Sequence, residues 1–190
     1  ALDLAVVKKP SSVRSASIAY SKNEETYTAG NLESDTHLLN ISSEQAVLAL
    51  SVSAQDYNVY KISTICEKAE KKTVLSPIVA KVIIDHQIRT GKKIEYENFD
   101  LEGKKIFSAK NLTKVLPFYN PENILLEKIA KKTSPSKNKA VFPKNGDFEK
   151  TLKKFALKGL SRNFPTYDSA SGYGSAVLTK DDSVYFSGQY

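Results

Sequence analysis

The chain of 190 residues has few of the residues that form disulfides and metal centres, with one cysteine and two histidines. A single cysteine, Cys66, excludes an intrachain disulfide and is typical of a protein from a reducing compartment. His37 and His86 have no second ligand at metal spacing and are expected on the surface. A cysteine-rich zinc site cannot be built from this set. We therefore expect a cytoplasmic protein in which Cys66 is a core thiol.

Long apolar runs are missing as well. No stretch of about 18 apolar residues occurs, which argues against a membrane span. The N-terminal sequence ALDLAVVKKP is too short and wrongly flanked for a secretory signal. Apolar residues still make up 41% of the chain, which suffices for the core of one domain, or of one domain plus part of another.

The formal net charge of +7 arises largely in one lysine-rich region. Few aromatic or arginine side chains are interleaved there, as a nucleic-acid site would require. Pro135, Pro143 and Gly146 interrupt the same region, so we interpret it as a solvated linker and expect no nucleic-acid partner. The lysines concerned are Lys128, Lys131, Lys132, Lys137, Lys139, Lys144, Lys150, Lys153 and Lys154.

Alternating, β-branched segments predict strands, and apolar residues at helical spacing predict helices. Asn40 is the expected N-cap of the first full helix. Ser76 and Pro77 open the second one and Gly91 ends it, while Asp147 caps a basic helix to about Leu160. The strands are expected at Ser15–Ser21, Thr26–Gly30, Val59–Cys66, 93–98 and 104–107. The helices are expected at 1–8 (a helix end), 40–54, 77–90, 112–116, 122–130 and 148–160.

A second hairpin, at 175–179 and 183–186, repeats the first hairpin without a gap at an offset of 158 residues (175 − 17). We interpret the match as an internal duplication, the alternative being a chance likeness of two hairpins rich in Ser and Thr. The matched positions are Ser17 with Ser175, Lys22 with Lys180, Tyr27 with Tyr185, and Gly30 with Gly188.

The order of elements and several short motifs resemble the cytidine deaminase family. G-N-L-E at 30–33 is similar to the family's Asn-x-Glu, which holds the nucleoside ribose. I-S-S-E at 41–44 resembles its I-C-A-E, and S-P-I-V-A-K at 76–81 resembles its S-P-C-G-A-C. The segment 102–118 resembles its closing strand and Leu-Leu-Pro element. The segment 164–177 is similar to the family's opening A-P-Y-S…V-G-A-A.

The resemblance implies an α/β fold: a cytidine deaminase-like three-layer α/β/α sandwich with a mixed five-stranded sheet, plus the start of a second similar module. The first, degenerate module is expected at 1–120, a helix and lysine-rich linker at 121–146, and the opening helix and hairpin of the second module at 147–190. Modules of this family complete one another's sites, so a homo-oligomer or module–module pairing is expected. Phe118, Tyr167 or Tyr173 could line such a shared pocket.

The resemblance also implies where the site lies. Zinc deaminases use three His or Cys ligands to activate a water, and a nearby Glu moves protons. The ligand positions here are Ser42, Ile78 and Lys81, and none of these side chains suits zinc. Glu44 stands at the proton-shuttle position. We therefore expect no metal in the first module, and zinc only in a completed second one.

Several of these residues have a plainer interpretation. Asn31 and Glu33 either hold the ribose hydroxyls of a pyrimidine nucleoside or are ordinary turn residues. Glu44 is either the remnant of a proton shuttle or a solvated or capping carboxylate in a first helical turn. Lys81 could pair with Glu44 where a metal would otherwise lie.

Two functions follow from the resemblance. The first is a homologue of cytidine deaminase, which hydrolyses cytidine or deoxycytidine to uridine, with a non-catalytic first module and catalysis only where a second module is completed. The alternative is a zinc-free pseudoenzyme that acts as a nucleoside-binding or assembly module. RNA binding through the lysine-rich region is a third alternative.

Overall fold

The computed structural model describes residues 2–7, 13–36, 39–67, 75–112, 137–143, 147–161 and 173–188. The chain divides into two compact units. Unit 1 comprises Ala1–Leu50 and Asn58–Ala130, and unit 2 comprises Ser51–Tyr57 and Lys131–Tyr190. In the ranges given above, no helix has both the length and the apolar character needed to cross a membrane.

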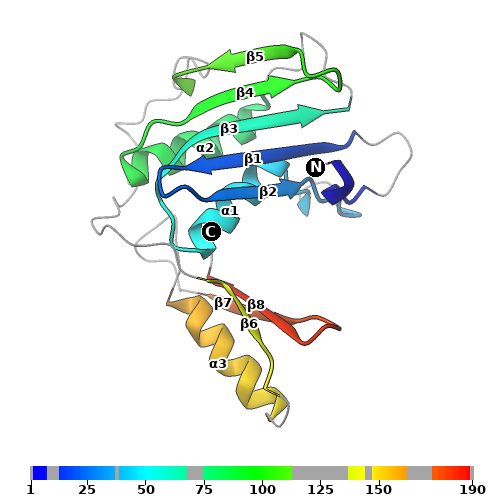
Figure 1. Cartoon of the computed structure of the whole chain (residues 1–190), viewed down its shortest axis with the longest axis vertical. Coiled ribbons are helices and arrows are strands. Elements are labelled where there is room, and N and C mark those ends of the chain that lie inside the picture. The colour runs from blue at the N-terminus through cyan, green and yellow to red at the C-terminus, as the bar shows by residue number, and fades with distance from the viewer. Residues whose placement is uncertain are drawn as a thin grey trace. The chain divides into compact units, whose positions relative to one another are not determined.

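Unit 1 is built on a mixed five-stranded sheet with the strand order β2-β1-β3-β4-β5 (Figure 1). Strands β3 and β4 are parallel, and the other neighbours are antiparallel. The expected bounds of the first three strands are confirmed, and β4 and β5 lie slightly later than expected. The strands are β1 (Ser15–Ser21), β2 (Thr26–Gly30), β3 (Val59–Cys66), β4 (Glu95–Phe99) and β5 (Lys105–Ala109).

Helix α1 (Ser43–Ser53) begins later than expected, and Ser42 rather than Asn40 caps it. The Ser42 Oγ accepts a hydrogen bond from the Gln45 backbone N at 3.1 Å, and the Gln45 Oε1 accepts one from the Ser42 N at 3.4 Å. This reciprocal pair is a capping box, which satisfies amides that the first turn leaves free. The expected cap was wrong because the Asn40 Oδ1 accepts from the Ser34 N at 2.8 Å and so braces the preceding loop.

Helix α2 (Pro77–Thr90) has the expected ends. Pro77 occupies its first position, and Gly91 ends it at φ 67°, a left-handed conformation that glycine adopts at little cost. His86 is buried, with 1% of its surface exposed, so its expected surface position was wrong. It lies three residues after the buried Ile83, on the same face of the helix. In Figure 1 both α1 and α2 lie behind the sheet.

The expected helix end at residues 1–8 was wrong over its described part. Residues Leu2–Leu4 form a short 3-10 helix, η1, and Val6 then makes an isolated bridge with Leu32. Of the helices expected at 112–116 and 122–130, only Leu112 is described, and it is buried. The prediction of an α/β fold with a mixed five-stranded sheet is confirmed.

Unit 2 contains a three-stranded antiparallel sheet with the order β6-β8-β7, comprising β6 (Lys139–Val141), β7 (Gly174–Leu178) and β8 (Ser183–Gly188). Helix α3 (Phe148–Leu160) packs on this sheet, with the Phe155 and Phe186 ring centroids 5.4 Å apart. The expected cap is confirmed, since the Asp147 Oδ1 accepts from the Lys150 N at 2.9 Å. The expected unstructured linker was wrong at β6, which is too short to have a recognisable period.

Candidate functional site

A cavity of about 870 Å³ in unit 1 brings together most of the residues expected at the site. Its volume lies within the range of small-molecule sites. The loop after β2 contributes Asn31 and Glu33, and the starts of α1 and α2 contribute Ser42 and Ile78. The remaining lining residues are Val13, Ser15, Leu32, Asn40, Ile41, Gln45, Ser76 and Val79.

The walls of this cavity combine apolar and polar side chains and carry little charge. Glu33 is the ionisable residue among those that line it. The first turns of α1 and α2 both reach the lining, so the positive ends of two helix dipoles lie at the wall. The arrangement can receive an uncharged ligand with several hydrogen-bonding groups and an apolar face against Ile78 and Val79.

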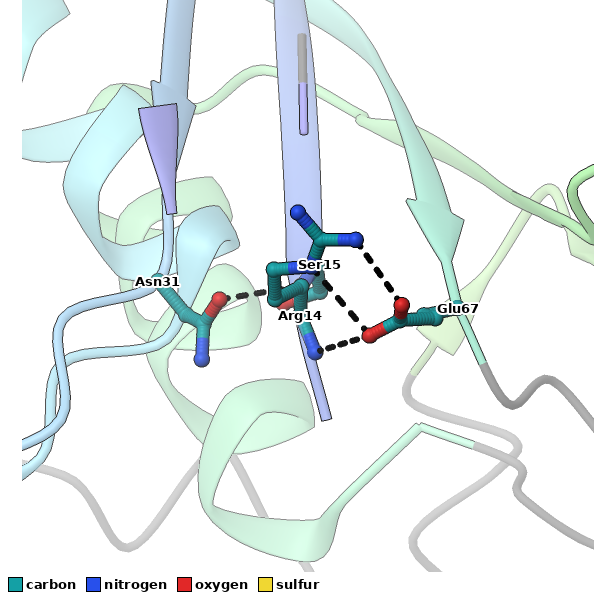
Figure 2. A network of polar contacts seen from close by, with 4 residues as sticks. All are labelled: Arg14, Ser15, Asn31 and Glu67. Atoms are coloured by element: carbon teal, nitrogen blue, oxygen red, sulfur yellow. Dashed lines mark hydrogen bonds and ion pairs between the residues drawn. The ribbon is translucent and has the colours of Figure 1, made fainter. Parts of the chain in front are cut away.

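Asn31 uses its side-chain amide to hold the start of β1. Its Oδ1 accepts a hydrogen bond from the Ser15 N at 2.9 Å, as Figure 2 shows. Its Nδ2 donates to the Val13 carbonyl oxygen at 3.2 Å. The backbone adds a third link, from the Asn31 N to the Ser15 O at 3.0 Å. Asn31 is therefore a brace between two strands at the cavity wall, and its contact with a ribose stays a prediction.

An ion pair that the sequence did not suggest lies beside this brace. The Arg14 Nη2 is 2.9 Å from the Glu67 Oε1, and the Arg14 Nε donates to the Glu67 Oε2 at 3.3 Å (Figure 2). The hydrogen bonds and the charge of Glu67 raise the pKa of Arg14. The two residues flank the paired ends of β1 and β3, so only the register of the sheet reveals the pair.

Glu44 does not belong to the cavity lining and is buried in the core, with 7% of its surface exposed. Its Oε1 accepts hydrogen bonds from the Thr64 Oγ1 at 3.1 Å and from the Tyr96 Oη at 3.0 Å. The Ser43 Oγ donates to its Oε2 at 3.4 Å. Burial first, and then the nearby Glu44 charge, raise the pKa of Tyr96. The solvated-carboxylate interpretation was wrong, because this side chain is directed toward β3 and β4.

Buried hydroxyl groups connect Glu44 with β1. The Ser17 Oγ donates to the Ser43 Oγ at 2.8 Å, and it lies 2.7 Å from the Thr64 Oγ1. The Ser15 Oγ, at the cavity wall, is 3.2 Å from the Ser43 Oγ. A signal for this network was present in the sequence, because Ser15, Ser17 and Ser21 recur at every second or fourth position of β1 and so share the side that α1 covers.

Lys81 lies outside the cavity lining and forms an ion pair within its own helix. Its Nζ is 2.5 Å from the Asp85 Oδ2, one helical turn further on. The expected pair with Glu44 was therefore wrong: Glu44 accepts its hydrogen bonds from hydroxyl groups on α1, β3 and β4.

The residues at the three expected ligand positions do not fit zinc. The Ser42 Oγ is engaged in capping α1, the Ile78 side chain has no donor atom, and the Lys81 ammonium would repel a cation. Elsewhere in the described ranges, no group of three or more His, Cys, Asp or Glu could hold a metal ion. No zinc-dependent step can be assigned to this cavity.

The aromatic residues expected at a shared pocket are only partly described. Tyr173 directly precedes β7 and is exposed. Phe118, Tyr167 and also His37 lie outside the described residues. Their expected positions stay predictions.

The geometry defines an α/β protein in which one mixed five-stranded sheet carries two helices and a cavity at their first turns. Comparison with a solved structure places this arrangement in the cytidine deaminase fold. Cytidine deaminase from Burkholderia pseudomallei matches with a TM-score of 0.51 and 14% sequence identity, covering 60% of this chain and 86% of that one. Cytidine deaminase from Mycobacterium tuberculosis matches with a TM-score of 0.43 and 18% identity, covering 62% and 85%.

Neither a protein-family model nor a curated protein matches this sequence. At 14% identity, the likeness to the Burkholderia pseudomallei structure establishes the fold. Function must be argued from the residues of the site, because one fold can carry many activities.

Proposed function

We propose that this is a deaminase-type protein built by duplication, in which unit 1 is a non-catalytic, structural module. Hydrolytic deamination of cytidine or deoxycytidine to uridine then depends on a completed second module, paired with unit 1 or with another copy. The observation that carries the proposal is that the former functional positions have structural partners. Ser42 caps α1, Lys81 pairs with Asp85, and Glu44 accepts hydroxyl hydrogen bonds in the core.

The backbone of the two hairpins supports the duplication. All five register pairs of β1 with β2 recur between β7 and β8 at the offset of 158 residues (174 − 16). Ala16 with Gly30 becomes Gly174 with Gly188, and the last pair, Tyr20 with Thr26, becomes Leu178 with Val184.

The two hairpin turns agree as well. Glu24 and Asp182, which are 158 residues apart (182 − 24), have φ of 63° and 58°, values uncommon for residues other than glycine. The Ser21 N donates to the Glu25 O at 3.0 Å, and its counterpart, the Thr179 N, donates to the Ser183 O at 2.9 Å. A chance likeness of sequence would not require the same register and the same turn.

Metal binding tests the non-catalytic role directly. The 190-residue chain, purified without added metal, should contain substoichiometric zinc and release no ammonia from cytidine. Stoichiometric zinc or measurable ammonia release would overturn the proposal. We also expect the triple variant Ser42→Cys, Ile78→Cys, Lys81→Cys to bind Co²⁺ with a thiolate-to-cobalt charge-transfer absorption, since three thiolates suit such an ion.

A matched control carries the same number of new cysteines with one of them moved. The variant Ser42→Cys, Ile78→Cys, Asp85→Cys places its third thiol one helical turn beyond Lys81. It should bind Co²⁺ more weakly and without the same absorption. Equal binding by both variants would contradict a former ligand set at Ser42, Ile78 and Lys81.

A second candidate function, binding of a pyrimidine nucleoside without chemistry, is favoured by the retained cavity of about 870 Å³ with Asn31 and Glu33 in its wall. Calorimetric titration with cytidine and uridine tests it. Glu33→Gln should weaken binding roughly tenfold, because a carboxylate makes stronger hydrogen bonds to hydroxyls than an amide does. Glu102→Gln, at an exposed loop position, is the control. The absence of a saturable signal at millimolar nucleoside would exclude this candidate.

A further inference from the structure

The two hairpins that share a register are covered on different faces. In unit 1, Ser17 and Ala19 are fully buried on the side of α1, and Ser17 is hydrogen-bonded to Ser43 of that helix. Their counterparts at the offset of 158 (175 − 17) are Ser175 and Val177. Both are exposed, and 59% of the surface of Val177 is accessible.

The opposite face of the second hairpin is the covered one. Phe186 and Val184 are buried there and Phe155 of α3 stacks on Phe186. The counterparts of these two strand residues, Thr28 and Thr26, lie on the face of the five-stranded sheet that is turned away from α1, because side chains alternate along a strand. Within the described residues, the helix of each unit therefore covers one face of that unit's hairpin, and the covered face in unit 2 is the opposite of that in unit 1.

The face that α3 leaves open carries large apolar side chains on neighbouring strands. We define the open hairpin face as Lys139, Val141, Ser175, Val177 and Tyr185. Val177 is directly opposite Tyr185, which is in turn opposite Lys139. The exposed fractions of Val141 and Tyr185 are 76% and 43%, high for apolar side chains gathered in one place.

The two hairpins also differ in whether a further described strand pairs with their outer edge. In unit 1, β3 pairs antiparallel with β1 on the side away from β2. In the described part of unit 2, β7 is the last strand of the sheet, and no strand pairs with that edge. Ser183 and Ser187 lie on the same side of β8 as Tyr185, because side chains alternate along a strand. Ser183 is buried and Ser187 is hydrogen-bonded to Ser53, so the open hairpin face is limited to the five residues named above.

We propose that the open hairpin face and the outer edge of β7 form a docking surface for a helix–strand segment of the α1–β3 type. The helix lies on the face and the strand adds antiparallel to the edge, as α1 and β3 do on β1. The proposal rests on the duplication proposed above. The occupant is a helix whose first turn has small hydroxyl side chains opposite Ser175 and whose apolar residues, like the buried Val47 and Leu48, cover Val177.

The chemistry of the surface favours this occupant over a charged one. The face consists of two valines, a tyrosine and a serine, and its lysine already lies over a tyrosine ring, with the Lys139 Nζ 5.2 Å from the Tyr185 ring centroid. Covering such side chains with an apolar helix face removes hydrocarbon from water. Pairing the edge satisfies backbone groups that an edge strand leaves to solvent.

A graft tests the proposal on the full chain. Residues 31–112 are appended directly after Gly188, because Asn31 follows Gly30 and Gly188 is the counterpart of Gly30. Hydrogen exchange is then measured at the β7 amides that do not pair with β8. We expect their exchange to slow by about tenfold or more relative to the 190-residue chain, since a paired and covered strand opens less often.

Two matched variants keep the test specific. Val47→Asp with Leu48→Asp, made only in the appended copy, should abolish the added protection, because the helix then has no apolar side for the open hairpin face. Val177→Asp should abolish it in the grafted chain and leave β7 exchange unchanged in the 190-residue chain, where this side chain is already exposed.

The proposal is overturned if the grafted chain gives no added protection, if the Asp-substituted copy protects β7 equally, or if the appended copy stays unfolded. None of these results bears on the zinc, ammonia and Co²⁺ measurements on unit 1. Failure of the docking surface and failure of the non-catalytic role can therefore be told apart.

Discussion

Glu44 is a buried carboxylate whose hydrogen bonds join a helix to two strands. A buried carboxylate is costly unless donors satisfy it. Hydroxyl groups from Ser43, Thr64 and Tyr96 do so here, and they connect α1 with β3 and β4. The carboxylate thereby becomes a structural link between a helix and two strands, while Ser42 beside it caps the same helix.

A double-mutant cycle on Glu44 and Tyr96 measures this link. We expect Glu44→Ala to lower the free energy of unfolding by about 2–4 kcal/mol, because it leaves three buried hydroxyl donors without this acceptor. The coupling energy with Tyr96→Phe should be about 1.5–3 kcal/mol, the range for hydrogen bonds to charged groups. Urea denaturation gives both values. Tyr60→Phe, at an exposed position, is the control, and a coupling energy near zero would contradict the role of Glu44.

At the scale of elements, two glycines determine how closely α3 packs on its hairpin. A Cβ at Gly174 would clash with the Ala156 carbonyl oxygen and with the Leu160 N. A Cβ at Gly159 would clash with the Ser187 O. These contacts involve backbone atoms, which cannot move aside as the end of a flexible side chain can. The helix and the strands can approach this closely only where a side chain is missing.

Gly174→Ala should therefore destabilise unit 2. Overpacking of this kind typically costs about 1–3 kcal/mol, and the loss should be visible as faster hydrogen exchange along α3. The neighbouring substitution Ser175→Ala, on the open hairpin face, should change stability by less than about 0.5 kcal/mol. If both substitutions had the same small effect, the close packing of α3 on β7 would be wrong.

A second feature at this scale is a carboxylate held between two lysines on the sheet of unit 1. The Lys61 Nζ is 2.6 Å from the Glu97 Oε2, and the Lys105 Nζ donates to the Glu97 Oε1. Glu97 is buried. The hydrogen bonds from Lys105 and then from Lys61 lower the pKa of Glu97 from its ordinary value of 4.5.

This shift predicts part of the acid sensitivity of the fold. Because the pKa of Glu97 is lower in the folded state than in the unfolded state, its contribution to stability is complete above the unfolded value. It is lost as the pH falls from there through the folded pKa. Glu97→Gln should lower stability at neutral pH and flatten its decline below about pH 4.5. Denaturant titrations at several pH values measure this, and an unchanged slope would contradict it. Glu102→Gln is an exposed control.

At the scale of the whole molecule, the net charge of +7 raises the question of polyanionic partners. The described lysines of α3 are exposed on the helix surface, and they comprise Lys150, Lys153, Lys154 and Lys158. This distribution is that of a solvated helix face. On the open hairpin face, Lys139 lies over the ring of Tyr185. Tyr185 belongs to the surface that we propose binds an apolar helix.

We accordingly expect only non-specific binding of nucleic acid. Fluorescence anisotropy with a mixed-sequence single-stranded RNA should give a dissociation constant of about 10⁻⁴–10⁻⁶ M near physiological salt, and the affinity should fall as salt is added. Lys150→Gln with Lys154→Gln should reduce the salt dependence without changing any preference among sequences. Tight binding that resists salt would contradict this expectation.

The sequence by itself determined most of the elements, because their signals are local. Alternation fixed the bounds of β1 to β3, Pro77 and Gly91 fixed the ends of α2, and Asp147 fixed the start of α3. The offset between the hairpins also came from sequence. The sequence did not predict β6, because three residues are too few to show a period. It also gave the wrong cap for α1, because Ser42 and Asn40 are both suitable caps within one polar loop.

The tertiary structure decided what the side chains at the expected site positions contact. The motifs identified Glu44, Lys81 and Asn31, but their partners, namely two strand hydroxyls, Asp85 and the start of β1, depend on how separate segments pack. The burial of His86 and the open face around Val177 were decided in the same way. Local patterns specify backbone conformation, whereas the neighbours of a side chain follow from strand register and helix packing between residues far apart in the chain.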